Sequence, residues 1–165
     1  MYSFAVMNHS VDAAKSEFLR AKDRIVRALE TTPDDRINWS PSMTARTAID
    51  QVAHVALSIP GIQGWLSGEP FPFKDVQELD TFSRTQEESF LTRESVLSLL
   101  EENSQGYLEW LDSLTEEQLA STVSMGPRAF PMMEAISFPA DHTRGHAAQM
   151  DYMQTIYGDL DWHMG

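Results

Sequence analysis

Apolar residues recur every three or four positions in four long stretches of the chain, which is the spacing that places side chains on one face of an α-helix. The stretches cover residues 10 to 31, 42 to 59, 93 to 114 and 132 to 157, each to within a few positions. No stretch shows the strict alternation of a half-buried strand. The pattern predicts an all-α fold built from four long helices.

Prolines, glycines and short polar residues indicate where these helices begin and end. Ser42 or Thr44 is expected to cap the second helix. Pro60 should end or kink that helix, and Pro139 should kink the fourth, because proline lacks the amide donor that a helix interior needs. Gly158 can adopt the left-handed conformation that closes the fourth helix.

The segment between the second and third helices, residues 66 to 91, loses the helical pattern and contains Pro70 and Pro72. We predict a long loop, with at most a helical turn near its end. Helices of about 15 to 22 residues are about 22 to 33 Å long, and only this connection can travel back along the bundle. The expected fold is therefore an up-down-down-up four-helix bundle in a single domain, residues 1–165.

Composition narrows the class of protein. No run of apolar residues is long enough for a membrane helix, and the first ten residues lack a targeting pattern, so we expect a soluble, cytoplasmic protein that binds no membrane. The formal net charge of -13 disfavours nucleic acid as a partner. The absence of cysteine leaves only nitrogen and oxygen ligands for a metal, and excludes a cysteine nucleophile.

Three histidines are candidates for a metal site. His142 and His146 are four residues apart on the fourth helix, so both rings project from one face. His54 lies within the second helix, and bundles build metal sites from inward side chains on facing helices. The spacing alone also fits two imidazoles bonded to backbone carbonyls and a lone core histidine, and both interpretations stay open at this point.

Besides the histidine of the second helix, the chain contains four short motifs, Trp39-Ser40-Pro41, Asp141-His142 with His146, Ala147-Ala148-Gln149-Met150 and Tyr157-Gly158-Asp159. In these features, and over roughly residues 10 to 160, the sequence resembles the DinB/YfiT-like superfamily of proposed metalloenzymes. It implies a DinB-like bundle of the up-down-down-up kind, frequent homodimers, and a metal held by residues matching His54, His142 and His146.

Three imidazoles leave one coordination position open, which is typical of a catalytic site rather than a structural one. Nitrogen ligands suit divalent Zn, Ni, Fe or Co, and the sequence does not choose among them. The open position can activate a water or a low-molecular-weight thiol, as in an S-transferase acting on a small-molecule substrate. The alternative is a non-catalytic ligand-binding or stress-response bundle in which the metal is structural or absent.

Some neighbouring residues have two interpretations. Asp50, Asp141 and Gln149 are placed to orient a histidine through its second ring nitrogen, or are ordinary surface and core-edge groups. The aromatic residues of the crossover either roof the metal pocket, hold the crossover on the bundle, or form a dimer contact; they are Trp65, Phe71, Phe73 and Phe82.

Overall fold

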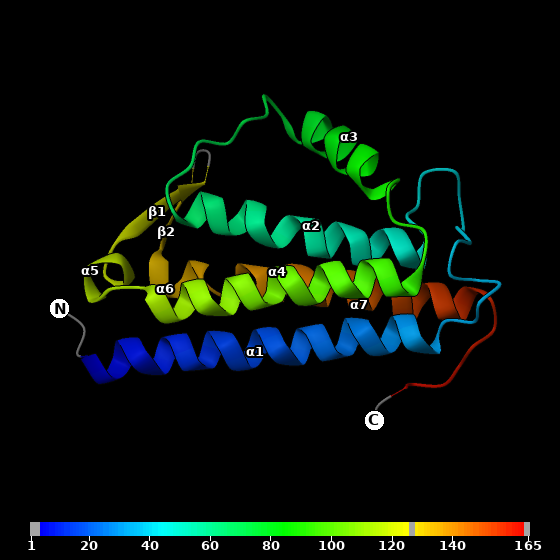
Figure 1. The fold of residues 1–165 in the computed structure, drawn as a ribbon, viewed down its shortest axis with the longest axis horizontal. Coiled ribbons are helices and arrows are strands. Elements are labelled where there is room, and N and C mark those ends of the chain that lie inside the picture. Colours follow the sequence, from blue (N-terminus) through cyan, green and yellow to red (C-terminus); the bar gives the residue numbers. More distant parts are fainter. Residues whose placement is uncertain (1–3, 126–127, 164–165) are drawn as a thin grey trace.

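The computed structural model describes residues 4–125 and 128–163. Its body consists of the four long helices α1 (Phe4–Thr31), α2 (Ala48–Leu66), α4 (Arg93–Ser113) and α7 (Phe138–Ile156). The smaller elements are α3 (Val76–Glu87), α5 (Glu116–Leu119), α6 (Met132–Ala135), β1 (Thr122–Met125) and β2 (Arg128–Pro131). The long helices lie side by side along one axis (Figure 1), so the helical bundle expected from periodicity is confirmed.

The packing of the bundle pairs helices that are far apart in the sequence. α1 packs mainly against α7, α2 packs mainly against α4, and α7 also contacts α2. In Figure 1, α1 and α7 run from left to right, whereas α2 and α4 run from right to left. The largest fully buried side chains include Tyr107, Phe18, Ile25 and Leu29, and each such side chain contributes about 1.5–3 kcal/mol relative to an exposed one.

No helix in residues 4–125 and 128–163 combines the length and the apolar character needed to cross a membrane.

The beginning of α2 differs from the prediction. Neither Ser42 nor Thr44 caps this helix; Thr47 does, since its side chain accepts from the Asp50 amide while the Asp50 carboxylate accepts from the Thr47 amide. This reciprocal capping box satisfies two amides that the helix leaves without partners. It also fixes the entry of the chain into α2, about two turns before His54.

Of the two outcomes expected at Pro60, an end or a kink, the end is wrong, because α2 continues through this residue to Leu66. A proline at position 60 cannot donate to the carbonyl of Ala56. The Asn103 side chain on α4 donates to that carbonyl instead, at 2.8 Å. A side chain from the neighbouring helix thus replaces the missing backbone hydrogen bond and lets α2 remain helical.

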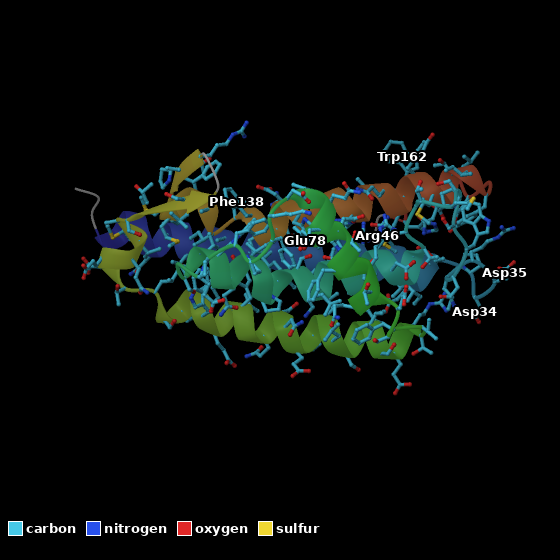
Figure 2. All side chains as sticks on the ribbon, turned by 90° about the horizontal axis from the view of Figure 1, so that it is seen from above. Asp34, Asp35, Arg46, Glu78, Phe138 and Trp162 are labelled. Atoms are coloured by element: carbon cyan, nitrogen blue, oxygen red, sulfur yellow. The ribbon has the colours of Figure 1, made fainter. Side chains whose placement is uncertain are left out.

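The crossover contains a helix that the sequence pattern did not predict. α3 lies above α2 in Figure 1, and Figure 2 shows it across the top of the bundle with Arg46 beside it. Asp75 caps it by accepting from the Glu78 amide at 2.8 Å. Its side chains are almost all exposed or half-buried, and Glu87 is its buried residue among those described, which explains why no apolar periodicity marks it.

The expectation of a fold without strands also needs a correction. β1 and β2 form an antiparallel pair in which Val123 faces Phe130. Of the described side chains in these strands, Val123 is the buried one. Strands of four residues with so little burial give no alternation that could be recognised in the sequence. The pair occupies the end of the bundle near α5, away from the middle of α2 (Figure 1).

The fourth predicted helix is divided into α6 and α7, and the break comes before Pro139 rather than at a kink there. Pro139 stands in the first turn of α7, where helix amides have no partner within the helix. At the other end, Gly158 has φ +96°, as predicted. The amides of Gly158 and Asp159 donate to the carbonyls of Thr155 and Gln154, which closes the helix in a Schellman motif.

Candidate metal centre

The three predicted histidines come together between α2 and α7. The ring centroids of His54 and His142 are 5.1 Å apart, those of His54 and His146 are 4.7 Å apart, and those of His142 and His146 are 4.6 Å apart. One nitrogen from each ring lies within 4.8 Å of the other two. This separation suits three ligand atoms around one ion.

In two of the rings, one nitrogen already forms a hydrogen bond to a neighbouring side chain. The Nδ1–H of His54 donates to the Glu87 Oε1 at 2.8 Å. The Nδ1–H of His146 donates to the Gln51 Oε1, and the Gln51 amide in turn donates to the Gln149 Oε1 at 3.0 Å. Both rings therefore carry their proton on Nδ1 and present the lone pair of Nε2 as a potential ligand.

The third ring supplies the observation that tests whether these residues fit a metal. The Nε2 of His142 is buried and has no hydrogen-bond partner among the residues that the structure describes. A buried polar atom without a partner costs free energy, and native proteins usually satisfy such atoms with a bond, a water or an ion. The nitrogens of His54 and His146 lie on the same cluster, so a cation on the three Nε2 atoms would satisfy all of them together.

Burial keeps two of these imidazoles neutral. It lowers the pKa of His142 to about 4, with help from the nearby His54 and Arg46. It lowers the pKa of His146 to about 3, again with the neighbouring histidines and Arg46 acting in the same direction. Since only the neutral ring has a lone pair to donate, both are ready to bind a cation at neutral pH.

Glu87 connects the histidines to a network of charged side chains. Its side chain is only 3% exposed, and its carboxylate accepts from Arg46 at 2.8 and 3.0 Å as well as from His54. Arg46 also donates to the Asp80 Oδ1 at 2.8 Å, and Asp80 accepts from Arg84 at 2.8 Å. Burial alone would raise the pKa of Glu87, but the hydrogen bonds from His54 and Arg46 hold it below its usual value.

The side chains expected to orient the histidines have other partners. Asp50 belongs to the capping box of α2. Asp141 is exposed and accepts from Arg144, whose other amine donates to Glu17 at 3.0 Å. Gln149 is an exposed residue that reaches the cluster only through Gln51. None of the three bonds directly to a histidine in the part of the chain that the structure describes.

The residues that do orient the rings are Gln51, on α2, and Glu87, on α3. Gln51 had a signal in the sequence, because it is a polar residue on the core-facing side of a strongly apolar helix. Glu87 had none, since it lies 33 positions from His54 in a segment without periodicity. Arg46 lies against Glu87 on the other side, and only 11% of the Arg46 side chain is exposed.

The aromatic residues of the crossover contact one another in a chain. The ring centroids of Trp65 and Phe71 are 4.9 Å apart, those of Phe71 and Phe73 are 5.4 Å apart, and those of Phe73 and Phe82 are 5.2 Å apart. Trp65 and Phe71 also line a cavity of about 530 Å³ at the end of α2, next to β1. Trp65 lies about 16 Å along α2 from His54, too far to cover the histidine cluster. The arrangement therefore supports a role of these aromatic residues in holding the crossover on the bundle.

Four long helices with inward-facing histidines from two of them define a class, the helical bundles that build a ligand site within their core. The family model of the DinB superfamily matches residues 17–150, and the chain belongs to this superfamily. The resemblance seen in the sequence is thereby confirmed. No curated protein matches the chain.

Solved structures share the fold at low sequence identity. An uncharacterised protein from Clostridium difficile 630 is 13% identical, with a TM-score of 0.72 over 88% of this chain and 96% of that one. YfiT from Bacillus subtilis, described as a probable metal-dependent hydrolase with an unusual four-helix bundle topology, is 16% identical, with a TM-score of 0.67 over 96% and 91%. A mycothiol-dependent maleylpyruvate isomerase is 16% identical, with a TM-score of 0.63 over 85% and 60%.

Proposed function

We propose that the protein is a metal-dependent enzyme in which the Nε2 atoms of His54, His142 and His146 hold a divalent cation, Zn, Ni, Fe or Co. The observation that carries the proposal is the buried Nε2 of His142, which has no hydrogen-bond partner among the described residues and belongs to a ring that clusters with His54 and His146. Such a cluster is stable without a cation only at the cost of a buried unsatisfied atom.

The surrounding residues prepare the three rings for this role. Glu87 and Gln51 accept the Nδ1 protons of His54 and His146, which fixes the tautomer and the orientation of each ring. Within residues 4–125 and 128–163, these three histidines form the group of side chains whose ligand atoms lie close enough together to hold an ion. Three protein ligands leave a position open to another molecule, which favours a reactive site over a structural one.

A bound divalent cation lowers the pKa of a water or thiol on its open position toward neutrality. The chain has no cysteine, so a thiol would have to come from a small cofactor. We favour thiol activation of the S-transferase type, with hydrolysis as the other possibility. Similar folds described as a mycothiol-dependent isomerase and as a probable metal-dependent hydrolase support both chemistries.

The test compares metal-free and Zn²⁺-loaded protein in two reactions, glutathione with a chromogenic aryl halide and water with a chromogenic ester. The proposal predicts that loading accelerates at least one reaction in the parent and neither in the His142→Ala variant. Equal rates for the metal-free and loaded parent would contradict it, and would favour a non-catalytic binding bundle.

We also infer the up-down-down-up order of the four long helices, within one domain covering residues 1–165. The helix directions in Figure 1 support this order. A single domain predicts one cooperative unfolding transition with the same midpoint by far-UV circular dichroism and by tryptophan fluorescence.

A homodimer remains part of the proposal. Its support is a set of exposed apolar side chains on and after the last turns of α7, Tyr152, Ile156, Leu160 and Trp162; Trp162 is labelled at this end of the molecule in Figure 2. The mass of one chain is 18.7 kDa. Sedimentation equilibrium is expected to give twice this mass, and a monomer at all concentrations would exclude the dimer.

A further inference from the structure

Glu87 is the point at which the crossover helix α3 touches the histidine cluster. It is the last residue of α3, it is 2% exposed, and its Oε1 accepts from the His54 Nδ1–H at 2.8 Å. This bond occupies Nδ1, so Nε2 is the nitrogen of His54 that is left for a cation. Glu87 is therefore placed to act on a ligand rather than to be one.

An ionised carboxylate can only accept hydrogen bonds, so it determines which nitrogen of His54 carries the proton. With Nδ1 protonated, the lone pair is on Nε2, the atom available to the cluster. The carboxylate also fixes the rotation of the ring and makes Nε2 a stronger donor to a cation. A neutral amide in the same place would do both less well.

The other side of Glu87 is tied to the bundle through Arg46. The Nε of Arg46 donates to Oε2 and one of its amines donates to Oε1, at 2.8 and 3.0 Å, which is the two-point geometry that arginine and carboxylate favour. The same amine of Arg46 donates to Asp80, which lies two turns earlier on α3. Arg84 joins Asp80 and also donates to the carbonyl of Thr44 at 3.0 Å. These bonds hold α3 against the segment that leads into α2.

We propose that Glu87 is the positioning residue of the candidate metal centre, orienting His54 for the cation and coupling the docking of α3 to metal binding. The inference rests on the proposed metal function. If α3 leaves the bundle, His54 loses its acceptor and the site loses affinity. By thermodynamic linkage, a cation that binds the oriented site must stabilise the docked position of α3 by the same factor.

The buried ion pair of Glu87 and Arg46 has a simpler explanation, in which it only attaches α3 to the bundle. In that case neither the tautomer of His54 nor the affinity for metal would depend on Glu87. Three measurements separate the explanations, and the first of them needs neither a metal nor a variant.

The first measurement is the tautomer of His54 in the metal-free parent at pH 7.5, from long-range ¹H–¹⁵N correlation spectra. The proposal predicts the Nδ1–H form, with a slowly exchanging Nδ1 proton. A ring in the Nε2–H form, or one that populates both forms equally, would overturn it.

The second measurement compares Glu87→Gln with the matched control Glu88→Gln, which changes the neighbouring exposed residue. Zn²⁺ affinity is measured by competition with a chromophoric chelator, after circular dichroism has shown that both variants are folded. Glu87→Gln should weaken binding about 10- to 100-fold, the usual effect of losing a group that orients a ligand, and the control should bind as the parent does.

Hydrogen exchange of the α3 amides is followed in the same samples. Zn²⁺ should slow exchange across Val76–Glu87 in the parent and in the control, and should do so much less in Glu87→Gln. Equal affinities in the two variants, or no effect of Zn²⁺ on α3 in the parent, would overturn the coupling. If the parent binds no Zn²⁺, the proposed function fails with it, whereas the tautomer of His54 still decides whether Glu87 positions the ring.

Discussion

Acidification should destabilise the metal-free protein over a pH range in which most carboxylates remain ionised. The pKa of His142 falls from 6.5 to about 4 on folding and that of His146 falls from 6.5 to about 3. The unfolded chain therefore binds more protons than the folded one below pH 6.5, and the free energy of unfolding must decrease as the pH falls from there toward 4.

The magnitude follows from the same values. At pH 5 an unfolded histidine of pKa 6.5 is protonated about thirty times as often as it is neutral, while the buried rings stay mostly neutral. Each ring then removes about 2 kcal/mol from the stability seen at pH 8, or about 4 kcal/mol for His142 and His146 together. Glu87 and Asp80 have lowered pKa values, so the stability they provide is lost only at more acidic pH.

The assay is urea unfolding of EDTA-treated protein between pH 8 and pH 5, followed by circular dichroism. The double variant His142→Gln and His146→Gln serves as the comparison, and the quantity compared is the change in free energy between the two pH values, not the stability at either one. If the double variant loses as much stability on acidification as the parent, the burial of these two rings is not the cause and the reasoning fails.

Two further predictions concern the helices that carry the site. Asn103→Leu should lower the free energy of unfolding by about 1–3 kcal/mol, because the carbonyl of Ala56 loses its donor. In urea titrations this loss of stability should be smaller in a protein that also carries Pro60→Ala, which restores a backbone amide. An equal loss in both backgrounds would contradict this explanation of the continuous α2. Gly158→Ala should lower the free energy of unfolding by about 1 kcal/mol, since residue 158 has a positive φ. A variant as stable as the parent in calorimetry would show that this conformation is not required.

The long helices and the histidines could be predicted because their signals are local. The spacing of His142 and His146 is a property of one helix and needs no knowledge of the fold. The apolar pattern of α2 alone left His54 open as a lone core histidine, and it was added to the site because the sequence resembles the DinB/YfiT-like superfamily. The proximity of the three rings, with centroids 4.6–5.1 Å apart, follows from these patterns and from the packing of α2 on α7.

The environment of the rings could not be predicted, because it depends on contacts between distant segments. Glu87 reaches His54 from α3, a helix with no apolar face of its own. One indirect signal existed. Apolar residues such as Val52, Ala53 and Val55 occupy more than half of the circumference of α2, which is wider than the stripe of a helix packed on one side. A helix of this kind needs additional cover, and α3 provides part of it.

Rules for single residues failed where another segment compensated. Pro60 predicts the end of a helix only if the carbonyl of Ala56 has no other donor, and Asn103 supplies one from α4. Ser42 and Thr44 are good caps by residue type, but Thr47 forms the capping box because Asp50 is three residues further on. In both cases the preference of a single residue was not sufficient, and its interaction with a partner residue decided the outcome.

The central claim, a metal held by three histidines, is tested most directly by elemental analysis of protein purified without an affinity tag. The parent is compared with the triple variant His54→Ala, His142→Ala and His146→Ala after both are dialysed against the same buffer. The account predicts about one divalent Zn, Ni, Fe or Co ion per chain in the parent and none in the variant. Equal metal content in the two proteins, or a parent that takes up no divalent ion when it is offered, would contradict it.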